Sequence, residues 1–332
     1  MFRSRTRILA PPLVIALLAL SGCATAIAAP GSTSPNGPPK TTLNVAVVPA
    51  VDSAGFFVAL HDGLFKKYGL TVNYTPAVSS DEVIDQQIAG TYDITGGNYV
   101  SYIQHYVNDG QRQLEVIAEG SVMQEGTQAI YTMPNSKITT LAQLKGHTLG
   151  INAPYNINYL LAASVLTENG IKLTQVRFPA QPIPFPQMAA ELAAGKIDAA
   201  AMPEPFATAA EQQYGAVELA DLNQGATGQF PIQGYVVTRS WAQANPGPLR
   251  AFISALSQGQ QLADTSRAAV EQAMESLNNA PDGQVAPMVA AVMAVNIYPT
   301  GVDKVRIQRV ADVMYQFGLL RSRFNVTPMI GP

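Results

Sequence analysis

The chain consists of two related halves, and this repeat limits its possible folds more than any other feature of the sequence. Ala89-Gly90-Thr91-Tyr92-Asp93 in the first half matches Ala194-Gly195-Lys196-Ile197-Asp198 in the second, and Gly69-Leu70 matches Gly170-Ile171. The offset of roughly 100 residues is far longer than the period of a solenoid repeat. The repeat therefore predicts two related lobes.

Strand and helix patterns alternate within each half. The apolar run 43–48 indicates a buried strand, residues 56–64 carry apolar side chains at helical spacing, and residues 71–74 alternate like a second strand. The second half repeats this order, with strands at 148–151, 174–178 and 197–201. Alternation of this kind is typical of parallel βαβ units, so we predict the α/β class with a mainly parallel, helix-flanked sheet in each lobe.

The run 234–238 indicates a strand that returns to the first lobe. We therefore predict a first lobe of residues 42–133 plus 234–332 and a second lobe of residues 134–233. The chain would cross between the lobes near 131–136 and near 230–235, which predicts a two-strand hinge.

The N-terminal residues have the layout of a secretion signal. Arg3, Arg5 and Arg7 precede the apolar stretch 8–20, which is too short to cross a hydrocarbon core of roughly 30 Å. The sequence Leu20-Ser21-Gly22-Cys23 resembles the lipobox of bacterial lipoproteins, which implies cleavage after residue 22 and lipidation of Cys23.

An ordinary signal peptide, cleaved after Ala26-Ile27-Ala28, is the alternative. Residues 23–41 are rich in Ala, Gly, Ser, Pro and Thr, which predicts a flexible tether. The protein is thus expected outside the cytoplasm, held at the outer face of the cytoplasmic membrane by a lipid anchor or free in the periplasm.

Composition argues against several function classes. The chain has 20 Lys+Arg against 23 Asp+Glu and no basic run, so the electrostatic pattern of a nucleic-acid binder is missing. One cysteine and three dispersed histidines leave no disulfide framework and no local metal motif. We expect no cofactor and no metal.

Three segments together resemble one family. They are Ala59-Leu60-His61-Asp62-Gly63-Leu64-Phe65-Lys66-Lys67-Tyr68-Gly69-Leu70, then Leu144-Lys145-Gly146-His147-Thr148-Leu149-Gly150, then Leu192–Ala200 running on to Glu204-Pro205-Phe206. In this order they resemble the solute-binding proteins of ABC importers, in the nitrate, sulfonate, taurine and thiamine-pyrimidine-precursor class.

The resemblance implies a type II periplasmic-binding fold with a ligand cleft between the lobes. It implies a monomeric receptor, not an enzyme, that captures a small polar solute (sulfonate- or taurine-like, or pyrimidine-like) and delivers it to a membrane permease driven by an ATPase subunit. The alternative is an enzyme on the same fold, similar to the thiamine-pyrimidine synthases or the menaquinone-pathway enzymes.

Four loops follow predicted strands, where α/β folds bind ligands at helix N-termini: 50–56, 95–99, 152–158 and 202–206. None contains Lys or Arg. The candidate ligand-binding residues in these loops are Asp52, Ser53, Phe56, Gly97, Asn98, Tyr99, Asn152, Tyr155, Asn156 and Glu204.

The polar members of this set would hold a ligand's acidic group, and the aromatic members would cover its apolar part. Asp52 and Glu204 disfavour a simple inorganic anion, since like charges about 4 Å apart repel by about 4 kcal/mol at an effective dielectric near 20. We expect a neutral, zwitterionic or amine-bearing solute with its amine on Glu204. Alternatively, Asp52, Ser53 or Glu204 serves as a helix cap.

Overall fold

Strands in the described part of the chain form two separate sheets. The computed structural model describes residues 41–110, 113–277 and 285–331. The first sheet has the order β2-β1-β3-β9-β4, and the second has the order β6-β7-β5-β8. The strands are β1 (Thr42–Val47), β2 (Thr71–Pro76), β3 (Ile94–Asn98), β4 (Leu114–Val122), β5 (Gln128–Thr132), β6 (Leu149–Gly150), β7 (Ala199–Pro203), β8 (Val217–Asp221) and β9 (Pro231–Thr238).

Each sheet is mainly parallel and contains one reversed strand. In the first sheet, β1 pairs in parallel with β2 and β3, whereas β9 runs antiparallel to β3 and β4. In the second sheet, β6 and β7 are parallel, whereas β5 runs antiparallel to β7 and β8. The reversed strands β5 and β9 each come directly after the chain has passed from one sheet to the other. The predicted α/β class with two helix-flanked sheets is confirmed.

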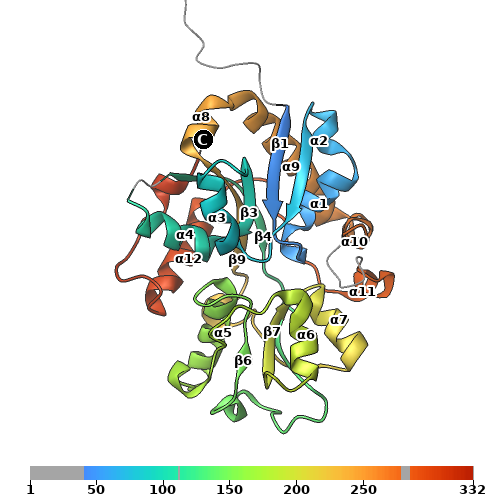
Figure 1. Cartoon of the computed structure of the whole chain (residues 1–332), viewed down its shortest axis with the longest axis vertical. Coiled ribbons are helices and arrows are strands. Elements are labelled where there is room, and N and C mark those ends of the chain that lie inside the picture. The colour runs from blue at the N-terminus through green and yellow to red at the C-terminus, as the bar shows by residue number, and fades with distance from the viewer. Residues whose placement is uncertain (1–40, 111–112, 278–284, 332) are drawn as a thin grey trace, which may run out of the picture. The chain divides into compact units, whose positions relative to one another are not determined.

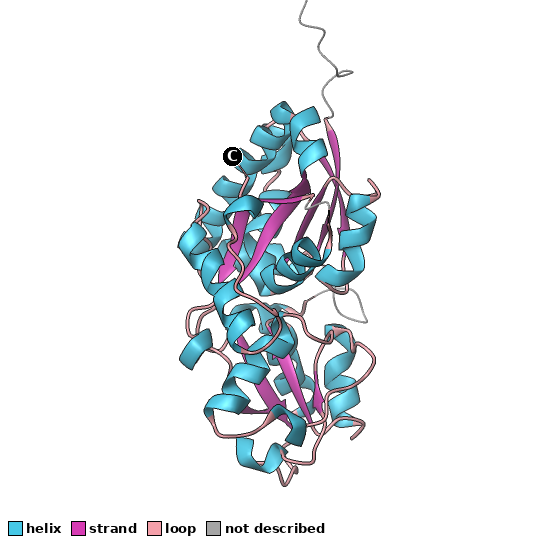
Figure 2. Ribbon diagram, turned by 90° about the vertical axis from the view of Figure 1, so that its left-hand side faces the viewer, coloured by secondary structure: helices cyan, strands magenta, loops and turns pink. Residues whose placement is uncertain are grey.

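Helices cover both faces of the first sheet and flank the second (Figures 1 and 2). Figure 1 shows α3, α4 and α12 on one side of the first sheet and α1, α2 and α10 on the other, with α5, α6 and α7 beside the second sheet. The helices are α1 (Ala54–His61), α2 (Leu64–Lys67), α3 (Ser80–Ile88), α4 (Tyr99–Asn108), α5 (Ile157–Glu168), α6 (Phe185–Ala193), α7 (Phe206–Tyr214), α8 (Arg239–Ala244), α9 (Pro246–Thr265), α10 (Arg267–Glu275), α11 (Pro287–Val292) and α12 (Lys304–Gln316).

The hydrophobic core fills the spaces between these layers. On one face of the first sheet, side chains of β1 pack against α1, α9 and α10, with Phe56, Phe65 and Phe252 at the centre. A second large cluster joins α4 and α12 to side chains of β4 and β9, and it continues to α5 beside the second sheet.

The glycines of the sequence repeat share one backbone role. Gly69, Gly90, Gly170 and Gly195 have φ angles of 79°, 86°, 70° and 68°. They follow the C-terminal ends of α2, α3, α5 and α6, where a residue with positive φ ends a helix and glycine adopts that conformation without strain. The repeat therefore reflects the same helix ending, used twice in each half.

The chain crosses between the sheets earlier than the sequence suggested. The first crossing is residues 123–127, between β4 and β5, not 131–136. The expected lobe boundary after residue 133 would leave β5 with the first lobe, but its apolar residues pair with β7 and β8 in the second sheet. The return crossing is residues 222–230, just before the expected 230–235. Residues 174–178 also differ, since they contain a 3-10 turn at Leu173–Gln175 and one isolated bridge instead of a strand.

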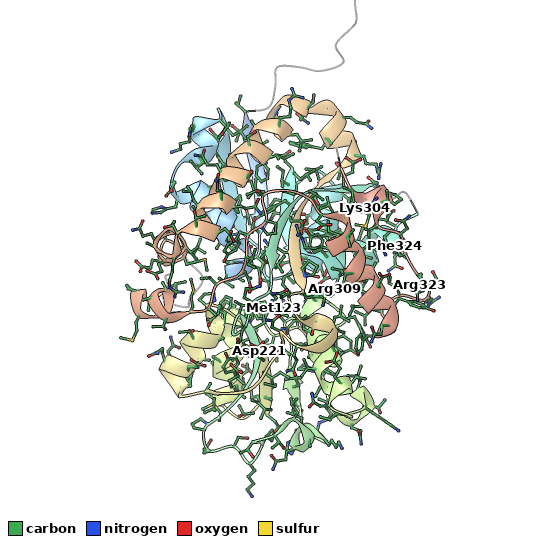
Figure 3. All side chains as sticks on the ribbon, turned by 180° about the vertical axis from the view of Figure 1, so that it is seen from behind. Met123, Asp221, Lys304, Arg309, Arg323 and Phe324 are labelled. Carbon is green, nitrogen blue, oxygen red and sulfur yellow. The ribbon has the colours of Figure 1, made fainter. Side chains whose placement is uncertain are left out.

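Arg309 of α12 holds the return crossing (Figure 3). Its guanidinium donates to the carbonyl oxygens of Ala226, Gly228 and Gln229 at 2.8, 2.7 and 3.2 Å, and it lies 5.4 Å from the centre of the Phe230 ring. Figure 3 shows Arg309 and Met123 near the junction between the sheets. The residues before β9 are thereby fixed to a helix of the first sheet.

The predicted signal segment 1–22, Cys23 and the tether up to residue 40 lie outside the described residues. Within the described ranges, no helix is both long enough and apolar enough to cross a membrane.

Candidate functional site

A small polar cavity lies where the two sheets meet. Its volume is about 30 Å³, which is room for about one water molecule. The described residues that line it are Val48, Asp52, Ser79, Ser80, Asn98, Gln128, Asn152, Asn156, Ile157, Asn158, Phe185, Pro203, Ile232 and Gln233. They come from both sheets and from both strands that follow the crossings, so a larger ligand could enter only if the two sheets moved apart.

Asp52 is the one charged side chain among the described residues of this lining. It lies in the 3-10 turn Val51–Ser53 after β1, and it is 6% exposed. Asn296 Nδ2 and Ser121 Oγ donate to its Oδ1 at 2.7 and 3.4 Å. Burial raises the pKa of Asp52 from 3.8 to about 6, although hydrogen bonds from Asn296, Ser121 and Gln128 favour the charged form. At neutral pH the carboxylate is therefore mostly charged and is held by neutral donors.

Three helices begin at the cavity. Ser79, Asn98 and Asn156 line it and are the N-caps of α3, α4 and α5. Their side-chain oxygens accept from the backbone N–H groups of the first turns, at 3.4, 2.9 and 3.2 Å. The N-terminus of a helix carries a partial positive charge and attracts negative groups. The site thus places helix N-termini from both sheets around one buried carboxylate.

Two buried side chains at the cavity have hydrogen-bond donors to spare. Asn158 is 1% exposed, and its Nδ2 has no hydrogen-bond partner. Ser80 Oγ accepts from the backbone N and from Nδ2 of Asn98, at 2.8 and 2.9 Å. A hydroxyl group accepts two hydrogen bonds and donates one, so the Ser80 proton remains to be donated. Buried donors in folded proteins are nearly always satisfied by protein groups, by water or by a ligand, so these two donors are available to a molecule in the cavity.

Four of the residues predicted from sequence meet at this cavity: Asp52, Asn98, Asn152 and Asn156. Asn156 Nδ2 donates to Asn152 Oδ1 at 2.8 Å, and this bond links the two ends of the loop before α5. The loops had been chosen because they follow strands, and in three of the four the structure brings at least one polar side chain to the lining.

The other predicted residues lie elsewhere. Ser53 is fully buried and donates to the carbonyl oxygen of Val48 at 2.7 Å, and Gln233 Nε2 donates to its Oγ at 2.9 Å. Gly97 is packed so tightly that a Cβ would come within 2.2 Å of Ser80 Oγ. Phe56 and Tyr99 are fully buried in the hydrophobic core. None of these side chains lines the cavity.

Tyr155 and Glu204 belong to the contact between the two sheets. Tyr155 is 62% exposed, and its carbonyl oxygen accepts from Gln104 Nε2 of α4 at 3.0 Å. The Glu204 carboxylate accepts from Thr208 Oγ1 and Thr208 N, at 2.7 and 3.1 Å, and from Ala294 N at 3.4 Å. Burial raises the pKa of Glu204 to about 7. The carboxylate thus accepts hydrogen bonds from the first turn of α7 and from the segment after α11, and it does not line the cavity.

Sequence reasoning missed five polar residues of the lining: Ser79, Ser80, Gln128, Asn158 and Gln233. Gln233 interrupts an otherwise apolar run in β9, which was an available signal, whereas Gln128 is the first residue of β5 and interrupts nothing. Asn158 is the last residue of a loop that was already a candidate. Ser79 and Ser80 begin a helix, a position where serine ordinarily needs no further explanation.

The lining offers hydrogen bonding, not nucleophilic or metal chemistry. Its side chains are carboxamides, hydroxyls, one carboxylate and apolar groups. In the described ranges, no three His, Cys, Asp or Glu side chains are grouped in a way that could hold a metal ion. Such a set of groups can bind a small polar molecule and orient it.

Comparison with known proteins gives a family match and many structural matches. The model of the NMT1-like family matches residues 36–278. The bicarbonate transport ATP-binding protein CmpC of Synechocystis sp. is 27% identical over 237 residues, which are 67% of this chain and 35% of that protein. The chain thus spans about a third of the length of that curated relative.

Solved structures with the same fold include two binding proteins. The alkanesulfonate-binding protein SsuA from Xanthomonas axonopodis pv. citri, bound to MOPS, superposes with a TM-score of 0.72 at 18% identity, covering 89% of this chain and 99% of that one. The periplasmic nitrate-binding protein NrtA from Synechocystis superposes with a TM-score of 0.69 at 16% identity, covering 86% and 84%. The fold of this chain is therefore that of periplasmic binding proteins.

Proposed function

This chain belongs to the NMT1-like family, and from that membership we propose that it is the solute-binding component of an ABC importer. It captures a small polar solute outside the cytoplasm and delivers it to a membrane permease that works with an ATPase subunit. The observation that carries the proposal is the cavity between the sheets, with its spare donors on Ser80 and Asn158.

The ligand residues of this proposal are the polar groups of the cavity lining. From the predicted set they are Asp52, Asn98, Asn152 and Asn156, and Ser80 and Asn158 join them. The names of the matched proteins support a small polar solute, since they refer to alkanesulfonate, nitrate and bicarbonate. Because the cavity has a volume of only about 30 Å³, the two sheets must move apart before a solute can enter or leave.

The two crossings supply the proposed hinge. Residues 123–127 and 222–230 are the links between β4 and β5 and between β8 and β9. Direct contacts between the lobes oppose opening, among them Gln104 Nε2 to the carbonyl oxygen of Tyr155 at 3.0 Å and Val51 N to the carbonyl oxygen of Glu204 at 2.9 Å. A solute larger than this cavity would hold the lobes somewhat farther apart than they are here, and its hydrogen bonds to both lobes would favour that bound form over a more open one.

Solute binding can be tested by thermal shift with a library of small polar compounds, followed by calorimetry on each hit. A ligand at 100 times its Kd should stabilise the protein by about 2.7 kcal/mol. Asn158→Ala should weaken the binding of that hit about tenfold, because a buried donor to the ligand is lost. Asn169→Ala is the matched control, since Asn169 follows the other end of α5 and its Nδ2 donates to the carbonyl oxygen of Val165. Equal affinities in the two variants would contradict this placement of the site.

Export and lipid anchoring form a second part of the proposal. The lone cysteine, Cys23, directly follows Leu20-Ser21-Gly22, the pattern that resembles a lipobox. In a bacterial host that processes lipoproteins, Cys23→Ala should abolish lipid labelling and release the protein from membranes. Intact-mass measurement checks the N-terminus. A wild-type protein that starts after Ala28 with no lipid would show that the segment is an ordinary signal peptide.

A further inference from the structure

A second and much larger cavity lies beside the crossings, and we call it the α9–α12 cavity. Its volume is about 770 Å³, within the range of about 300–1,000 Å³ that is usual for small-molecule sites. Its walls are the C-terminal half of α9, residues 297–300, the part of α12 that carries Arg306 and Arg309, Val122 at the end of β4, and Gln229 of the return crossing. Among the described residues, none lines both this cavity and the one between the sheets.

We propose that the α9–α12 cavity is a second small-molecule site, and that it takes an organic acid whose acidic group pairs with Arg309. The inference goes beyond the proposed solute-binding function, because this ligand binds at other residues than the transported solute does. The apolar part of the acid packs on the side chains of residues 297–300 that line the cavity.

Arg309 is a half-buried cation without a carboxylate partner in the described part of the chain. Its three hydrogen bonds all go to carbonyl oxygens of the return crossing. Burial lowers the pKa of Arg309, and no nearby carboxylate offsets this effect. A guanidinium group has five N–H donors, so two remain for a ligand. An acid would supply both the missing counter-charge and a charge-assisted hydrogen bond.

The neighbouring arginine already has such partners. Arg306 lines the same cavity, and its Nε and Nη2 donate to the two carboxylate oxygens of Glu119 at 3.1 and 2.9 Å. Asp303 Oδ2 lies 3.4 Å from its Nη1. The charge of Arg306 is thus balanced within the chain, so Arg309 is the arginine with which an acidic ligand would pair.

Asp264 is the carboxylate among the described lining residues of the α9–α12 cavity. Its Oδ1 accepts from Tyr298 N at 3.1 Å, and within the described ranges it pairs with neither arginine of the lining. The Asp264 side chain is exposed, so water and salt screen its repulsion of an acid. The half-buried Arg309 is screened less, and its attraction for the acid is therefore the larger effect.

An apolar surface for the rest of the ligand lies in the same cavity. Ile297 is 43% exposed although it is a large aliphatic residue, and Pro299 and Val122 line the cavity with it. The backbones of Ile297 and Val122 are joined by two hydrogen bonds of 2.9 and 3.1 Å, so this surface is in place before a ligand binds. A bare inorganic anion would use Arg309 but not this surface, which favours an organic acid.

The site also includes part of the proposed hinge. Gln229 has a φ angle of 47°, a left-handed conformation that residues other than glycine rarely adopt. Its carbonyl oxygen accepts from Arg309 Nη1 at 3.2 Å. An acid on Arg309 would therefore bind beside a strained residue of the return crossing, and its binding should slow the local opening of residues 222–230.

The first test is calorimetry with 2-naphthoate and 2-naphthamide, which have nearly the same shape and differ in the charge of one group. For the wild-type protein we expect 2-naphthoate to bind at least tenfold more tightly than 2-naphthamide. Arg309→Gln should abolish this preference. In the wild type, 2-naphthoate at saturation should also slow the hydrogen exchange of the amides of residues 222–230.

A pair of substitutions on α9 locates the site without altering Arg309. Ser257 lines the cavity, so Ser257→Trp should fill part of it and weaken 2-naphthoate binding at least tenfold. Ser254→Trp is the matched control, because Ser254 is exposed, lies one helical turn earlier on α9 and is not part of the lining. It should leave the affinity unchanged.

The wild-type comparison can overturn the inference even if Arg309→Gln fails to fold. Equal affinities for the two probes, or no binding of 2-naphthoate, would overturn it. Equal effects of Ser257→Trp and Ser254→Trp, or unchanged hydrogen exchange of residues 222–230 at saturation, would place the acid elsewhere and equally overturn it. Loss of 2-naphthoate binding in Asn158→Ala would place the acid between the sheets, which would overturn the second site but support the proposed solute-binding function.

Discussion

Replacing Asp52 by Asn and Glu204 by Gln together should make the protein progressively more stable than the wild type as the pH rises. Burial raises the pKa of Asp52 from 3.8 to about 6 and that of Glu204 from 4.5 to about 7. The folded state therefore holds these protons more tightly than the unfolded state does. Their favourable contribution is fully present below the unfolded pKa values, and it is lost as the pH rises through the folded values.

One pKa unit corresponds to about 1.4 kcal/mol, so each carboxyl group loses about 3 kcal/mol and the pair about 6 kcal/mol between about pH 4 and pH 8. Urea denaturation across this range, on the wild type, both single variants and the double variant, measures the difference. A stability difference that stays constant with pH, or shrinks as the pH rises, would contradict the expected sign.

Phe56→Ala should destabilise the fold by about 3–5 kcal/mol without changing the ligand affinity of the folded molecules. The ring is fully buried, and its centre lies 5.4, 5.4 and 5.9 Å from the ring centres of Phe57, Phe65 and Tyr74. Truncation would leave a cavity that these neighbours fill only in part.

Tyr155→Ala is the comparison, because the sequence suggested that both aromatic rings cover the ligand. Tyr155 is 62% exposed, and the centre of its ring lies 5.2 Å from the centre of the Tyr159 ring. Loss of the Tyr155 ring should therefore lower the free energy of unfolding by about 1 kcal/mol or less. Urea denaturation of both variants, with calorimetry below their transitions, tests the contrast. A Phe56→Ala protein of unchanged stability but reduced affinity would place the ring in the binding site after all.

Much of the candidate site could be located from sequence because of where its loops begin. Asp52, Asn98 and Asn156 come just after β1, at the end of β3 and shortly after β6, and parallel strands bring their carboxyl ends to one edge of a sheet. Asn98 and Asn156 are themselves the N-caps of α4 and α5, a position that asparagine favours. Gln128 and Gln233 could not be placed in the same way, because they lie in the two reversed strands and reach the cavity only through the crossings.

Neighbouring residues of one loop also take different roles that no local pattern separates. Asp52 lines the cavity, whereas Ser53 beside it is bonded to Gln233. Phe56, one helical turn further on, packs into the aromatic cluster of the core. The direction of each side chain depends on partners that are far away in the sequence. Asn296, for example, donates a hydrogen bond to Asp52 although the two residues are 244 positions apart.

The sequence by itself determined the α/β class, the two related sheets and the loops that could carry a site, because strand periodicity, helix endings at glycine and the order of elements are local properties. Only the tertiary structure decided that β5 belongs to the second sheet, that Glu204 serves α7 and the segment after α11, and that Asp52 is the carboxylate at the cavity. These outcomes depend on burial and on hydrogen-bond partners supplied from elsewhere in the chain, and a buried polar group is placed where those partners are.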